Sequence, residues 1–169
     1  IRTMNCTAAC VDKGDNIMNE THTAKEITAD LLDALKHQGL CLKEALQMIE
    51  KGEEMAEIIH VPMVITVVDE GGNTVAMHRM DDSLLASISI SYSKAYTAAA
   101  LRAPTGEAAR DILPGQSLYG LQQTHPGKFC IFGGGIPIMK NGRCIGGLGV
   151  SGGTVEQDMT VARHALSLD

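Results

Sequence analysis

The 169-residue sequence has no tryptophan and few aromatic residues of any kind. Aromatic residues make up 3% of the chain, and they are Tyr92, Tyr96, Tyr119, Phe129 and Phe132. Hydrophobic residues nevertheless make up 44% of it, so the core must be built from aliphatic side chains and methionine. A chain of this length suits one domain that buries roughly two thirds of its unfolded surface.

Basic charge is also scarce, and the formal net charge is −6 at pH 7. Nucleic-acid-binding proteins usually carry a basic surface and often aromatic stacking platforms, so we expect no nucleic-acid partner. No apolar run approaches the ~20 residues that span a bilayer, and the acidic balance disfavours an anionic membrane surface. The N-terminus lacks the basic-then-apolar order of a signal peptide. We therefore expect a cytoplasmic protein without membrane contact.

The five cysteines are an odd number, scattered along a chain that shows no export signal. This pattern favours reduced thiols over a disulfide framework. Cys6, Cys10 and His22 resemble a metal-ligand set, but the C-x3-C spacing has no second pair to complete it. The sequence therefore predicts no metal site.

Two helices are predicted before the first strand. Residues 1–22 have no sustained periodicity and are expected to form a disordered or extended tail. The segment 23–39 has apolar residues at helical spacing and stops at Gly39, which favours an amphipathic helix. A second apolar face begins at Leu42, and the thiol of Cys41 is a poor N-cap for that helix.

The remaining chain predicts two hairpins, a further strand and three helices. β-branched runs flank a turn at 69–73, and a second hairpin over 135–150 turns on Asn141-Gly142. The other predicted elements are helices within 83–104, 105–112 and 154–168 and a strand at 128–132. No parallel β-α-β repeat occurs, so the sequence predicts an α+β fold with an antiparallel sheet. The long connection 103–127 is of a kind that is usually functional or mobile.

Three glycines, Gly147, Gly149 and Gly152, fit the G-x-G-x-x-G pattern of a dinucleotide-binding loop. That fold needs a second parallel strand ending about 20 positions later, and only 17 residues follow Gly152, so the dinucleotide hypothesis fails. Two interpretations of the last helix start remain open. The amides around Gly153 and Thr154 can seat a carboxylate or phosphate, or the glycines serve a tight strand-to-helix turn.

Several segments together carry a family resemblance: VPMVITVVDEGGNTVAMHRMDD, SYSKAYTAA, PGQSLYG, FGGGIPI and GGLGVSGGTVEQD, in that order. Over residues 40–167 the chain resembles the GlcG/HbpS-like family, and within it the C-terminal domain of PduO-type corrinoid adenosyltransferases. The resemblance implies a profilin-like fold, in which helices cover both faces of a five-stranded antiparallel sheet. It makes residues 40–169 the domain and 23–39 an N-terminal helical extension.

The resemblance also implies functions. Members of this family bind haem, and some are linked to redox sensing or corrinoid reduction. The ATP-dependent adenosyltransferase domain of the PduO type has no counterpart here, so that activity is not expected. The 23–39 helix resembles peptides that direct enzymes into bacterial microcompartments, and the alternative is a helix that packs on the domain or a neighbour.

Candidate site residues follow from charge and spacing. His78 and Arg79, with Asp81 and Asp82, form the densest polar group. One interpretation is a cluster that serves as acid and base or binds a ligand. The other, which we favour, is an ion pair between Arg79 and either Asp81 or Asp69 that fixes the hairpin. Lys94 is a lone cation on a small, apolar helix face; buried, it needs a partner and can bind an acid group, and exposed it merely extends to solvent.

Haem binding needs an axial donor, most often histidine. His125 ranks first because it lies in the long loop near the FGGG cluster; His78 ranks second and His60 third. Gly133 and Gly134 in that cluster indicate either a flat ligand against the backbone or a tight subunit contact.

The favoured hypothesis is a non-catalytic, homo-oligomeric module of bacterial diol or glycerol utilisation that binds haem, another tetrapyrrole or a small anionic ligand. The first alternative is an enzyme, such as a corrinoid reductase or one acting on a small acid, with Lys94 and Arg79 holding the substrate. The second is a structural or interaction subunit whose function is its interface.

Overall fold

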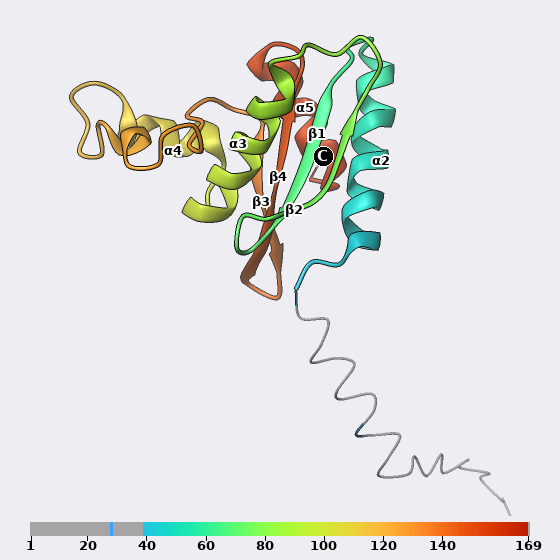
Figure 1. Ribbon diagram of the computed structural model, residues 1–169, viewed down its shortest axis with the longest axis horizontal. Coiled ribbons are helices and arrows are strands. Elements are labelled where there is room, and N and C mark those ends of the chain that lie inside the picture. Colours follow the sequence, from blue (N-terminus) through green and yellow to red (C-terminus); the bar gives the residue numbers. More distant parts are fainter. Residues whose placement is uncertain (1–27, 29–38, 169) are drawn as a thin grey trace, which may run out of the picture.

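The computed structural model describes Thr28 and residues 39–168 (Figure 1). Its elements are α2 (Leu42–Ile58), β1 (Val64–Asp69), β2 (Thr74–Arg79), α3 (Ser87–Leu101), α4 (Thr105–Ile112), the 3-10 turn η1 (Leu121–Gln123), β3 (Gly135–Lys140), β4 (Arg143–Ser151) and α5 (Val155–Ala165). The predicted tail 1–22 and nearly all of the predicted 23–39 helix lie outside the described residues. The two hairpins and the helices predicted after Gly39 are confirmed.

The strands form one antiparallel sheet in the order β2-β1-β4-β3. Each hairpin turn is fixed by its own residues. In the first, one carboxylate oxygen of Asp69 accepts from the amides of Gly71 and Asn73, both at 2.9 Å. In the second, Asn141 and Gly142 both have positive φ, 51° and 76°, as a two-residue hairpin turn requires.

The sheet has four strands among the described residues, so the prediction of five is wrong. Residues 128–132, predicted as a strand, begin in a turn and pair with no strand, and backbone groups of Cys130 and Phe132 bond side chains instead. The Thr97 hydroxyl accepts from the amide of Cys130 at 2.8 Å, and the Thr105 hydroxyl donates to the carbonyl of Phe132 at 2.9 Å. The threonines of α3 and α4 therefore take the place of a β ladder.

Helices cover both faces of the sheet, as predicted. Helix α3 packs across β4, β1 and β3 on one face, while α2 and α5 pack side by side on the other (Figure 1). The main core lies under α2 and α5 and is aliphatic, with Ile49, Ile65, Leu148, Val150 and Val161 fully buried. Within residues 39–168, no helix has the length and apolar character that a membrane span needs.

The glycines of β4 let α3 lie directly on the sheet. A Cβ atom at Gly147 would overlap the carbonyl oxygen of Ala95, and one at Gly149 would overlap that of Ser91. Beside them, the hydroxyls of Thr66 and Ser91 form a buried hydrogen bond of 2.8 Å between strand and helix. This part of the G-x-G-x-x-G pattern therefore serves helix–sheet packing.

The carboxylate of Glu44, the third residue of α2, closes the start of this helix. The Glu44 carboxylate accepts from the Cys41 amide at 3.0 Å and from Lys140 Nζ at 2.9 Å. The backbone hydrogen bond from Cys41, followed by the bond from Lys140, lowers the pKa of Glu44 from 4.5 to about 2.

Because the folded-state pKa of Glu44 lies below its ordinary value, its stabilising effect is complete above about pH 4.5 and disappears as the pH falls towards 2. We expect Glu44→Gln to lower the urea midpoint at pH 7 and to match the wild type near pH 2. Glu50→Gln, at an exposed position of the same helix, is the control and should change little at either pH. If the urea midpoints of Glu44→Gln and the wild type differed by the same amount at pH 7 and at pH 2, this electrostatic role of Glu44 would be contradicted.

Candidate functional site

A hollow lies between α3 and the segment 121–132, and we call it the α3 groove. Its volume is about 420 Å³, within the roughly 300–1,000 Å³ range of small-molecule sites. The lining is mostly apolar or small and consists of Ser89, Ile90, Ser93, Gln122, Gly127, Phe129, Cys130, Ile131 and Phe132. No carboxylate is among these residues, so the groove is electrostatically open to an anionic ligand.

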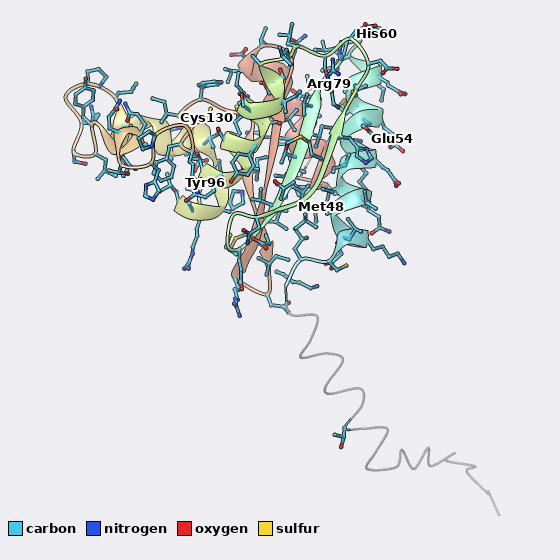
Figure 2. All side chains as sticks on the ribbon, viewed as in Figure 1. Met48, Glu54, His60, Arg79, Tyr96 and Cys130 are labelled. Carbon is cyan, nitrogen blue, oxygen red and sulfur yellow. The ribbon has the colours of Figure 1, made fainter. Side chains whose placement is uncertain are left out.

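Aromatic rings gather at one end of the α3 groove. The ring of Phe129 lies 6.0 Å from that of Tyr96 and 4.9 Å from that of His125, centroid to centroid. Lys128 Nζ lies 5.0 Å from the centroid of the Tyr96 ring. Figure 2 shows Tyr96 of α3 and Cys130 of the 105–132 segment on the same side of the sheet. The groove thus combines an aromatic end with a nearby exposed cation.

His125 lies at the rim of this aromatic end. Its imidazole is exposed, and its Nδ1 is 3.0 Å from the hydroxyl of Thr124. When Nδ1 donates to Thr124, Nε2 carries the lone pair that a metal ion binds. The edge contact with Phe129 orients the ring. Of the three predicted histidines, His125 is therefore the one beside the α3 groove.

Two groups inside the α3 groove are polar and poorly solvated. The side-chain oxygen of Gln122 is buried and has no hydrogen-bond partner among the described residues. A buried amide oxygen without a partner is costly, and it points to a ligand group or water that completes it. Burial raises the pKa of the Cys130 thiol above its ordinary value, so Cys130 is a neutral thiol at pH 7.

Lys94 is completely buried beneath the groove. Its Nζ donates to the carboxylate of Asp158 at 2.5 Å and to the carbonyl of Val150 at 2.9 Å, and it lies 5.0 Å from the centroid of the Phe132 ring. The partner that a buried Lys94 requires is therefore a carboxylate of α5. Gly134, at φ 113°, is needed here because a Cβ atom would lie 2.7 Å from Nζ.

His60 and His78 lie away from the α3 groove, where α2 meets β2 and the loops around them (Figure 2 labels His60). The hollow in that region, the α2 groove, is lined by Glu53, Ala56, Glu57, His60, Val61, Pro62, Met80 and Asp81. His78 Nδ1 is 3.0 Å from the Glu53 carboxylate. Three carboxylates and no lysine or arginine line this groove, so it is unfavourable for an anionic ligand.

Arg79 ends the edge strand β2, which β1 separates from β4, whereas the amino group of Lys94 is bonded to Val150 of β4 and Asp158 of α5. The expected ion pair from Arg79 to Asp81 or Asp69 is wrong: none joins them among residues 39–168, and Asp69 is used by its own turn. The amino group of Lys94 is thus occupied by Asp158 and Val150 and is not free to hold a substrate together with Arg79.

The amides predicted to seat an anion at the start of α5 already donate within the chain. The Gly153 amide donates to Asp158 Oδ1 at 3.0 Å, and the Thr154 amide donates to the Gln157 side chain at 2.9 Å. Thr154 is the N-cap, as predicted, and accepts from the Gln157 amide. An external anion at Gly152–Thr154 would have to compete with Asp158 and Gln157.

Asp158 and Gln122 were not among the predicted site residues. A signal for Asp158 exists, because it shares a helical face with the buried Val161, Ala162 and Ala165, and a carboxylate on an apolar face implies a cationic partner. Gln122 lies in the single 3-10 turn η1 of the long connection, which is too short for periodicity to give such a signal.

Comparison with known proteins decides the family. A family model described as "Haem degrading protein HbpS-like" matches residues 40–167. The chain belongs to the HbpS-like family. The match covers all the described strands and helices from α2 to α5, and it confirms the resemblance drawn from the sequence motifs.

Two relatives extend the comparison of this HbpS-like chain. It is 51% identical to a 15.0 kDa protein of the dhaT-dhaS intergenic region of Citrobacter freundii, over 75% of this chain and 89% of the relative. It is 34% identical to the corrinoid adenosyltransferase PduO of the same species, over 98% of this chain and 52% of PduO. The chain therefore spans about half the length of PduO.

Among solved structures, the HbpS-like fold is shared with a complex of PduOC and haem. That crystal structure superposes with a TM-score of 0.74 and is 39% identical, covering 78% of this chain and 95% of PduOC.

Proposed function

We propose that this HbpS-like protein is a tetrapyrrole-binding module that holds haem in the α3 groove, with His125 as the axial donor. The observation that carries the proposal is the groove itself. It is apolar and aromatic, no carboxylate lines it, and it lies beside an exposed histidine whose Nδ1 is already held by Thr124. These are the features that a flat, hydrophobic macrocycle with anionic propionates and a metal centre needs.

The surrounding residues fit such a ligand. Lys128 is an exposed cation between Gly127 and Phe129, both of which line the groove, so it can pair with a propionate. The buried amide of Gln122 can offer its oxygen or, after a turn about χ3, its NH2 group to a ligand. Bound haem would supply an iron centre for ligand exchange and one-electron chemistry.

The comparisons support the same class of ligand. The matching family is described by haem degradation, and a structural relative was crystallised with haem. Haem is therefore the tetrapyrrole we propose to test first.

Titration of the purified chain with haemin, followed by absorption spectra, tests this function. We expect a saturable, sharp Soret shift in the wild type. His125→Ala should remove the shift or weaken binding at least about tenfold, because the iron loses its axial donor. His60→Ala and His78→Ala are matched controls in the carboxylate-lined α2 region and should bind as the wild type does.

Other outcomes are equally decisive. A weak, non-saturating response in the wild type would reject haem binding. Saturable binding that is lost in His60→Ala or His78→Ala, and kept in His125→Ala, would move the site to the α2 groove.

We also propose that the module acts as a homo-oligomer in bacterial diol or glycerol utilisation. The proposed homo-oligomer is supported by the 105–132 segment, which extends from the body of the domain (Figure 1). This segment exposes Leu113, Leu118 and Tyr119, and a second copy of the chain would cover this apolar surface. The proposed role in diol or glycerol utilisation is supported by a relative, the corrinoid adenosyltransferase PduO. Sedimentation as a single monomeric species would contradict the oligomer. The enzymatic alternative lacks comparable support, because the amino group of Lys94 is buried and already bonded to Asp158 and Val150.

A further inference from the structure

We propose that Phe132 is the platform on which the planar macrocycle stacks, and that the buried Lys94 strengthens this stacking from behind the ring. The inference rests on the proposed function and deepens it. It names a residue pair that selects flat aromatic ligands independently of the axial bond to a metal.

The two faces of the Phe132 ring have different neighbours. Lys94 Nζ lies over one face, 5.0 Å from the ring centroid. Phe132 also lines the α3 groove and is 46% exposed. Since Lys94 is completely buried, the face opposite it is the one that a ligand in the groove can contact.

Both members of this pair are held in place. The carbonyl of Phe132 accepts from the Thr105 hydroxyl at 2.9 Å. The next three residues are glycines with no free space, because a Cβ atom at each would meet Met159, Lys94 or Thr105 within 3.0 Å. Lys94 is fixed by its bonds to Asp158 and Val150. The ring therefore offers a preorganised surface rather than a mobile side chain.

The position of the cation has a chemical consequence. An aromatic ring carries negative charge on both faces, and this charge repels a second π system stacked directly on it. A desolvated ammonium group on one face attracts that density and so makes the opposite face less negative. An electron-rich macrocycle should then stack better on Phe132 than on a phenylalanine without a cation behind it. Lys94 is thus a positioning residue that acts through Phe132.

Iron-free protoporphyrin IX separates stacking from axial coordination, and binding is followed by its fluorescence in parallel with haemin absorption. We expect Phe132→Leu to bind both probes roughly tenfold more weakly, while Phe132→Tyr, which keeps the ring, stays close to wild type. Tyr119→Leu replaces another exposed aromatic residue, outside the groove lining, and should change neither affinity. His125→Ala should weaken haemin binding and spare protoporphyrin.

The role of Lys94 is tested with the double variant Lys94→Met/Asp158→Asn, which removes both charges and keeps the side-chain shapes. We expect it to weaken protoporphyrin binding when Phe132 is present and to have no further effect when combined with Phe132→Leu. An equal loss in both backgrounds would mean that Lys94 acts on the groove generally, and would overturn its role through the ring.

The failures of the two proposals are distinguishable. Saturable wild-type binding with an unchanged affinity in Phe132→Leu would overturn the platform and leave the haem-binding function standing. Absence of saturable binding of either probe to the wild type would overturn both. Because Phe132 is half exposed, its substitution should not unfold the protein, and circular dichroism checks this.

Discussion

Replacing Gly149 with alanine should destabilise the fold by about 3 kcal/mol or more, at the upper end of the cost of overpacking a core. The added methyl group would overlap the carbonyl oxygen of Ser91, and the amide nitrogen of Ala95 would be 2.5 Å away. Both atoms belong to the backbone of α3, so no side-chain rotation relieves the clash. Urea unfolding followed by circular dichroism measures the loss.

Gly39→Ala is the matched control. A Cβ atom at Gly39 has no other atom within 4 Å, and its φ is outside the positive region, so we expect an unfolding midpoint within experimental error of the wild type. If Gly149→Ala also retained the wild-type midpoint, α3 would have to lie further from β4 than it does in this structure.

Asp158→Asn should cost about 3 kcal/mol or more, because it leaves the ammonium group of Lys94 buried without a counter-charge. Asparagine has nearly the shape of aspartate and can still accept from the Gly153 amide, so the loss measures the charge. Chemical denaturation at pH 7 gives the change in the free energy of unfolding. Glu156→Gln, at an exposed position of the same helical turn, should change it by less than about 1 kcal/mol.

The double variant Lys94→Met/Asp158→Asn should recover most of this loss, because a buried ion pair replaced as a unit leaves no unpaired charge. Recovery would establish that the two charges are coupled. A double variant as unstable as the sum of the single variants would show that each side chain stabilises the fold independently.

The features of the fold that were predictable from sequence are those fixed by neighbouring residues. The Asn141-Gly142 turn, the Thr154 cap and the apolar face of α2 all depend on contacts within a few positions. The 128–132 strand prediction failed for the opposite reason. Its composition suits a strand, but the donors and acceptors that decide its structure belong to Thr97 and Thr105, about 25 to 35 positions earlier in the chain.

The candidate site shows the same limit. Proximity of His125 to the FGGG cluster suggested a ligand site in the long loop, and its aromatic neighbours are there. However, the contact with Tyr96 depends on how the loop returns to α3. The need of Lys94 for a partner followed from its setting, but Asp158, 64 positions away, could be chosen only after both helices were placed on the sheet.

The close contact between α3 and the β4 glycines makes the two walls of the α3 groove unequal. One wall is a helix whose backbone cannot slide or tilt without colliding with the sheet. The other, over residues 121–130, is held to α3 by the hydroxyls of Ser93 and Thr97, and each such bond contributes only about 0.5–1.5 kcal/mol. A molecule wider than the resting gap would therefore enter by bending this outer wall, while α3 and the Phe132 end of the groove, which Thr105 and the three close-packed glycines hold, keep their shape. The groove can in this way tolerate variation in a ligand's rim substituents while its fixed side continues to discriminate flat faces from puckered ones.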